Sequence, residues 1–121
     1  MATKYRELLE KVRDLKLNKD DMPPLTYEDE NDLLEEPITI ERNHLVHMLK
    51  RFKQERITQE DIYDWIHFVW FSDYFTCPDE DADCITSVIQ TLEELEEEGN
   101  ITPQETERCL YALEHNEPIY E

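Results

Sequence analysis

The chain has 121 residues, of which 31 are Asp or Glu and 12 are Lys or Arg, and its formal net charge is −19. A chain of this length suits one compact domain, and a charge of this sign and size repels nucleic acid and anionic lipid. The 39% of hydrophobic residues, the single Gly and the six Pro favour a helical protein over a turn-rich sheet protein.

The first elements are predicted from apolar residues at helical spacing and from residues that begin or end helices. We expect an amphipathic helix over residues 3–16. Residues 18–26 include Pro23 and Pro24, which break the helical pattern, so we expect a flexible connector there. Acidic residues after Thr26 suit a helix N-terminus, and they predict a short helix over 27–36 that has few apolar residues.

A longer helix is predicted after Pro37, with Thr39 as its N-cap and with its buried stripe formed by Leu45, Met48, Leu49 and Phe52. Its outer face is the one basic surface that the sequence offers. We expect acids from neighbouring segments to pair with much of this charge, which comes from Arg42, Lys50, Arg51, Lys53 and Arg56.

The next helix is predicted to begin with Thr58 as its N-cap and to end near Phe75. Apolar and aromatic side chains occur on nearly all of its sides, so we expect it to be the central element of the fold. An acidic turn over 78–81 follows it.

A helix over 82–98 should end at Gly99, because a helix C-terminus favours a left-handed residue. Thr102 then begins the last predicted helix, which is followed by a tail over 117–121. The expected fold is therefore all-α: residues 1–121 form a single domain, a compact bundle of about five to six helices around an aromatic-rich central helix.

The charge is divided unequally along the chain. Residues 1–56 contain 11 Lys and Arg against 13 Asp and Glu, whereas residues 57–121 contain Arg108 as their one cation against 18 acids. The two halves therefore have net charges of −2 and −17. Such a field accelerates encounter with a basic partner. We expect the target to be a cationic macromolecule.

Residues 1–7 show no apolar sorting signal, and no run approaches the roughly 18 apolar residues that a membrane span requires. We therefore expect a cytoplasmic protein without membrane contact. The thiols of Cys77, Cys84 and Cys109 form no C-x-x-C pair, so they are expected to be reduced, with a Cys77–Cys84 bridge as the alternative.

Sites for metals, cofactors and catalysis are not expected. Residues 79–83 begin like a calcium loop, but Cys84 replaces the required Gly and Gln90 replaces the bidentate Glu. His44 and His47 lack a second pair of zinc ligands at useful spacing. A single Gly leaves no Gly-rich loop to bind phosphate or to form an oxyanion hole, so we do not expect an enzyme.

Two acidic clusters and the aromatic residues before them are the candidate partner-binding site. The second cluster lies near the end of the helix over 82–98, where negative charges oppose the helix dipole. Apolar anchors surrounded by anionic groups are typical of an interface hot spot. The alternative interpretation is that the clusters are solvated helix faces. The candidate residues are Trp70, Asp73, Tyr74, Asp79, Glu80, Asp81, Asp83, Glu93, Glu96 and Glu97.

The stretch from Arg56 to Glu114 contains the run Ile57-Thr58-Gln59-Glu60-Asp61-Ile62-Tyr63-Asp64-Trp65, then an acidic loop, an amphipathic helix and the run Ile101-Thr102-Pro103-Gln104-Glu105. This half of the chain resembles small helical immunity proteins of bacterial contact-dependent growth inhibition and related polymorphic toxin systems. The resemblance implies a cytosolic antitoxin that binds the C-terminal toxin domain of a delivered protein, often a nuclease, and blocks its active site or an adjoining surface. A 1:1 complex with a basic nuclease is the expected assembly.

Two alternatives use the same acidic surface. A nucleic-acid mimic would inhibit a DNA- or RNA-binding protein without having one cognate toxin. An acidic scaffold would use its carboxylates only for solubility. The gene neighbourhood separates these classes, because an immunity gene should directly follow a large toxin gene.

Overall fold

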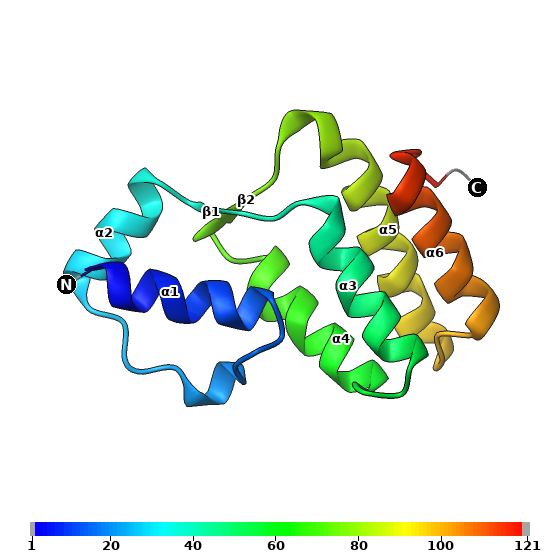
Figure 1. Cartoon of the computed structure of the whole chain (residues 1–121), viewed down its shortest axis with the longest axis horizontal. Helices are drawn as coiled ribbons and strands as arrows, with labels where there is room; N and C mark the ends of the chain where they lie inside the picture. Colours follow the sequence, from blue (N-terminus) through cyan, green and yellow to red (C-terminus); the bar gives the residue numbers. More distant parts are fainter. Residues whose placement is uncertain (1, 120–121) are drawn as a thin grey trace.

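The computed structural model describes residues 2–119, and most of these residues are helical (Figure 1). This part of the chain contains six α-helices: α1 (Ala2–Arg13), α2 (Tyr27–Glu35), α3 (Arg42–Lys53), α4 (Gln59–Trp65), α5 (Asp79–Glu98) and α6 (Pro103–His115). The shorter elements are a 3-10 turn η1 (Lys19–Asp21), a π-helical segment η2 (Ile66–Trp70) and two short strands, β1 (Ile38–Thr39) and β2 (Phe75–Thr76). The predicted all-helical class is confirmed, apart from this small sheet.

The helices form two groups that meet at the sheet (Figure 1). Helices α1 and α2 pack together at one end, while α3 packs against α5 and α6 at the other. Strands β1 and β2 are parallel, with Ile38 opposite Phe75 and Thr39 opposite Thr76. One buried cluster includes residues from both groups, such as Leu9 of α1 and Leu49 of α3, so a common core joins them.

Four helix ends agree with the residues that predict them from the sequence. Thr26, Thr58 and Thr102 each accept a backbone hydrogen bond at the start of α2, α4 and α6. Gly99 ends α5 with a φ of 107°, a conformation that residues with a Cβ adopt at a cost. Each of these signals depends on residues within one turn of the helix end, which is why the sequence alone reveals them.

The helix predicted to begin at Thr39 begins at Arg42 instead. Thr39 lies in β1, where the N–H of Ile38 donates to the carbonyl of Tyr74 at 2.8 Å and that of Ile40 donates to the carbonyl of Thr76 at 2.7 Å. The N-cap is Glu41. Thr39 is therefore not the N-cap, because strand β1 pairs with the distant strand β2.

Two further boundaries differ from the prediction. Helix α1 ends at Arg13 and not at residue 16, because Leu15 takes a φ of 63° that no α-helix contains. Helix α5 begins at Asp79, so the predicted acidic turn is the first turn of that helix. Negative charge stabilises this end of a helix.

An aromatic-rich centre is not observed. The largest fully buried side chains are aliphatic or Met, and α4 exposes Asp64 while η2 exposes His67. The aromatic ring contacts among the described residues join His67 to Phe71 and Tyr111 to His115, and all four of these residues are exposed. The core is thus built mainly from branched aliphatic side chains.

Within residues 2–119, no helix combines the length and the apolar character needed to cross a bilayer. Cys77, Cys84 and Cys109 are free thiols, and the alternative Cys77–Cys84 bridge is not formed.

Candidate partner-binding surface

The predicted acidic residues of α5 lie at its two ends. Asp79, Glu80 and Asp83 are exposed in the first turns, while Glu96 and Glu97 are exposed in the last turns. At about 1.5 Å per residue, the 10 positions from Asp83 to Glu93, the next predicted site residue of α5, correspond to about 15 Å along the helix axis. The sequence-predicted site is therefore two separate acidic patches.

Asp81, which the sequence predicts to be part of the partner-binding site, does not belong to either exposed patch. Its side chain is buried, with 7% of the residue exposed, and Oδ1 lies 2.9 Å from Nε of Arg42. Nη1 of the same guanidinium donates to the carbonyl of Leu113 at 2.8 Å. Helical periodicity directs Asp81 inward with Cys84 and Ile85, so this carboxylate joins helices within the protein.

The N-terminal patch consists of Asp79, Glu80 and Asp83. These carboxylates lie at the positive end of the α5 dipole, which by itself favours acidic residues there. The backbone carbonyl of Glu80 also accepts a hydrogen bond from the side-chain amide of Asn116 at 3.1 Å. Local helix stability therefore accounts for this patch without a partner.

The C-terminal patch consists of Glu93, Glu96 and Glu97, which lie near the negative end of the helix dipole. Glu93 is half-buried and the other two are exposed, while Leu92 and Leu95 supply the buried face. No basic residue occupies the last turn of α5. Carboxylates at this end raise the free energy of the helix, so helix stability does not explain them.

Phe71 is the exposed aromatic residue beside the C-terminal patch. More than half of it, 56%, is exposed, and its ring stacks on His67 with the ring centres 6.1 Å apart. Nε2 of His67 lies 3.9 Å from Oε1 of Glu96. The His67 side chain thus lies between the exposed Phe71 ring and the Glu96 carboxylate.

Phe71 follows directly after the π-helical segment η2. The N–H of Phe71 donates to the carbonyl of Ile66, five residues earlier, at 3.2 Å. Phe71 still keeps the helical spacing of the exposed residues Asp64 and His67. The prediction did not include it because it treated this helix as apolar on nearly all of its sides.

The predicted aromatic anchors are less accessible than Phe71. Trp70 and Tyr74 are both half-buried and pack against the core. Burial, with the carboxylate of Glu30 in α2, raises the pKa of the Tyr74 hydroxyl. Asp73 lies exposed in the turn between them.

Three of the five basic residues of the predicted basic face pair with acids within the protein, while Nε of Arg51 is buried without a hydrogen-bond partner among the described residues. Lys50 lies 3.8 Å from Glu114, Lys53 pairs with Glu107, and Arg42 pairs with Asp81. These partners belong to α6 or to the buried side of α5. Among the described side chains of residues 5–119, the ion pairs involve none of Asp73, Asp79, Glu80, Asp83, Glu93 and Glu97.

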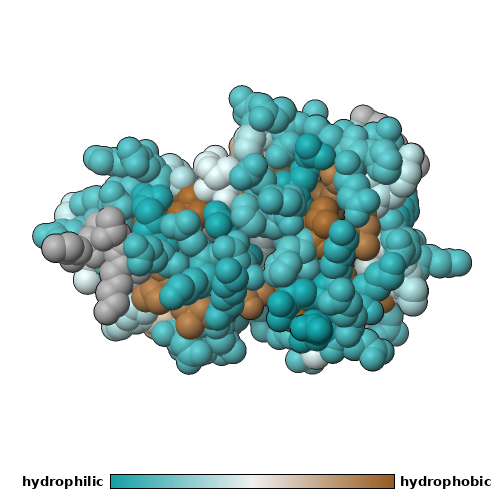
Figure 2. Space-filling view, viewed as in Figure 1, coloured by the Kyte–Doolittle hydropathy of each residue, from teal (hydrophilic) through white to brown (hydrophobic). Residues whose placement is uncertain are grey.

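Figure 2 shows a mostly hydrophilic face on which apolar side chains occur in small separate patches. The described residues contain no group of three or more His, Cys, Asp or Glu that could hold a metal ion.

Comparisons with protein-family models, with curated proteins and with solved structures find no match.

Proposed function

We propose that this protein is an immunity protein that binds and neutralises a cognate toxin domain, a basic nuclease, in a 1:1 complex in the bacterial cytoplasm. The observation that carries the proposal is the C-terminal end of α5, where Glu93 and Glu97 have no ion pair among the described residues and Phe71 is exposed nearby. The resemblance of residues 56–114 to contact-dependent growth inhibition immunity proteins supplies the toxin class.

Physical chemistry links this surface to that function. A nuclease needs a basic surface to bind phosphates, and an acidic protein can occupy the same surface. Opposite charges steer encounter and raise the association rate constant toward about 10⁸ M⁻¹s⁻¹. An exposed aromatic side chain such as Phe71, once it is buried against the partner, slows dissociation. An antidote needs both properties, because it must capture the toxin before its substrate is cut.

A nucleic-acid mimic is less compatible with the spacing of the acids. Duplex DNA carries one charge per about 1.7 Å of its axis. The outward side of α5 bears the neutral residues Thr86 and Gln90 between its two acidic patches. This interruption favours a localised contact over imitation of a continuous phosphate backbone.

The test is co-purification with the product of the gene directly upstream, followed by a nuclease assay with and without this protein. We expect light scattering to show a 1:1 complex and the nuclease activity to be lost in it. A nuclease of similar charge from an unrelated source serves as the control and should stay active. Inhibition of both nucleases would favour the mimic, and inhibition of neither, without a complex, would favour the scaffold.

A further inference from the structure

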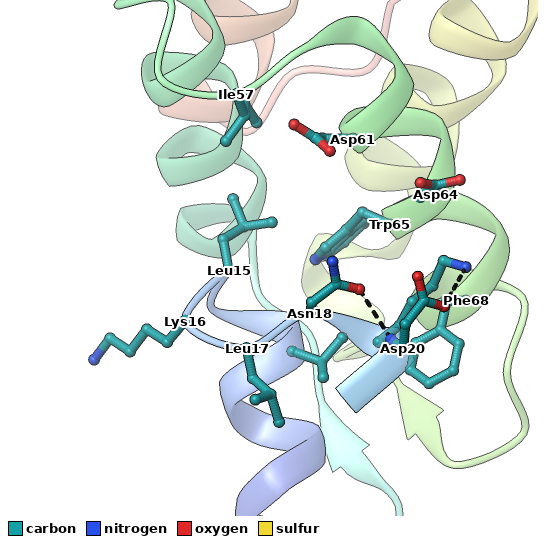
Figure 3. A pocket seen from close by; sticks show the side chains of 12 residues that line it. Leu15, Lys16, Leu17, Asn18, Asp20, Ile57, Asp61, Asp64, Trp65 and Phe68 are labelled. Carbon is teal, nitrogen blue, oxygen red and sulfur yellow. Dashed lines mark hydrogen bonds and ion pairs between the residues drawn. The ribbon is translucent and has the colours of Figure 1, made fainter. Parts of the chain in front are cut away.

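A pocket of about 320 Å³ lies between the segment that follows α1 and the α4–η2 helix (Figure 3). In Figure 3, Asp61, Asp64, Trp65 and Phe68 lie along the helical side, facing Leu15 and Leu17 of the segment after α1. This volume is at the lower end of the range of about 300–1,000 Å³ typical of ligand sites, so it suits one long side chain.

The apolar wall of the pocket is held in place by the backbone. Nε1 of Trp65 donates to the carbonyl of Arg13 at 2.9 Å, which fixes the indole against the end of α1. Leu15, with its φ of 63°, turns the chain so that Leu15 and Leu17 form the opposite wall. The pocket is therefore preformed.

Two carboxylates that line the pocket, those of Asp61 and Asp64, have no ion pair among the described side chains of residues 5–119, whereas Asp20 pairs with Lys19. Asp61 accepts a hydrogen bond from the Thr58 N–H through Oδ2, which leaves Oδ1 for another donor. Lys19 is 3.5 Å from Asp20, and the Lys16 side chain extends away from the pocket in Figure 3. A cation is thus the charge that the pocket can still accept.

The pocket adjoins the surface around Phe71. The exposed residues of α4 and η2 form one stripe with the helix end, made of Glu60, Asp61, Asp64, His67 and Phe71. A partner seated on Phe71 would therefore reach Asp64 along the same helix.

We propose that this pocket receives an arginine side chain of the protein partner. The aliphatic stem would pack against Leu15 and Leu17, and the guanidinium would lie against the Phe68 ring and pair with Asp64. A planar guanidinium stacks on aromatic rings and pairs with carboxylates better than an ammonium does. The partner's identity as a toxin rests on the proposed function, whereas the preference of the pocket for a guanidinium does not.

The first test uses agmatine, whose four-carbon stem carries a guanidinium at one end and an ammonium at the other, titrated into the ¹⁵N-labelled protein and followed by NMR. We expect saturable shifts at the Trp65 indole N–H and at the amides of Asp64 and Phe68. Asp64→Asn should weaken binding at least fivefold. Glu35→Gln removes the same charge from an exposed site on α2 and should leave binding unchanged, while putrescine should bind more weakly than agmatine.

Three results would overturn the proposal: shifts spread over all acidic helices without saturation, an equal loss in the Glu35→Gln protein, or putrescine binding as tightly as agmatine. Amide spectra of each variant confirm that it is folded.

The second test uses the product of the upstream gene. If a complex forms but Asp64→Asn and excess agmatine leave its stability unchanged, the pocket proposal fails and the immunity proposal stands. If agmatine binds in the pocket but no complex forms, the immunity proposal fails and the guanidinium site stands.

Discussion

Nε of Arg42 lies 2.9 Å from Oδ1 of Asp81, and this pair joins the start of α3 to the first turn of α5. Because the same guanidinium also donates to the Leu113 carbonyl, it connects three helices. Asp81, which the sequence predicts to lie in an exposed turn, is thus buried and stabilises the packing of these helices.

Replacing Asp81 by Asn should lower the free energy of unfolding by about 2 kcal/mol, because a charge-assisted hydrogen bond is weakened while Arg42 stays partly buried. Urea unfolding followed by circular dichroism measures the change. Asp83→Asn is the matched control, and it should change stability by less than about 0.5 kcal/mol because its side chain is exposed. Equal unfolding midpoints for the two variants would show that the Arg42 pair contributes nothing.

Charge and apolar contact at the C-terminal patch should affect different rate constants of toxin binding. Reversing Glu93 and Glu97 to Lys should lower the association rate constant roughly tenfold at low salt and reduce its salt dependence, because steering depends on long-range charge. Stopped-flow fluorescence at several ionic strengths measures this. Rates that stay unchanged would exclude the patch from the interface.

Phe71→Ala should mainly speed dissociation, by tenfold or more if the ring is a hot spot worth about 2 kcal/mol. Tyr111→Ala is the matched control, because Tyr111 is similarly exposed, at 57%, and also stacks on a histidine. Surface plasmon resonance gives both dissociation rates. Similar rates for the two variants would mean that Phe71 lies outside the contact.

The stability of the protein should fall as the pH is lowered below about 6.5, the ordinary pKa of His. Burial and the Arg13 guanidinium lower the pKa of His44, and they outweigh the Asp14 carboxylate 3.6 Å away, which acts in the opposite direction. The folded protein thus takes up this proton at a lower pH than the unfolded chain does. Nδ1 of His44 accepts the N–H of Glu41 at 2.8 Å, which a protonated ring nitrogen cannot do.

Urea midpoints at pH 7.5 and pH 5.5 test this titration. His44→Gln should reduce the difference between the two midpoints, whereas His47→Gln, at an exposed position of the same helix, should keep it. A difference that persists in full in the His44→Gln protein would assign it to other groups.

The three thiols should resist alkylation in the folded protein. Burial raises the pKa of Cys77 to about 11 and that of Cys109 to about 12, so little reactive thiolate exists at pH 8. Iodoacetamide labelling followed by mass spectrometry should show three additions in urea and far slower labelling without it. An oxidised mass, 2 Da lower, in the native protein would instead indicate a bridge.

The amino-acid sequence by itself determined the helical class, three of the four threonine caps, the stop at Gly99 and the excess of acid after residue 56. Capping and left-handed helix ends are local, because the groups that satisfy them lie within a few residues of each other. The excess of acidic residues is a property of the composition, so it can be counted without a structure.

Only the tertiary structure decided which of those residues face a partner. The β1–β2 pairing places Thr39 in a strand instead of in α3, and the pair with Arg42 buries Asp81 beneath the acidic surface. Packing also leaves Phe71 exposed, on a helix that the sequence predicts to be apolar on nearly all of its sides. Each outcome depends on contacts between distant parts of the chain, which decide which side chains are buried. Local periodicity does not predict these contacts, because they form only when the helices pack together.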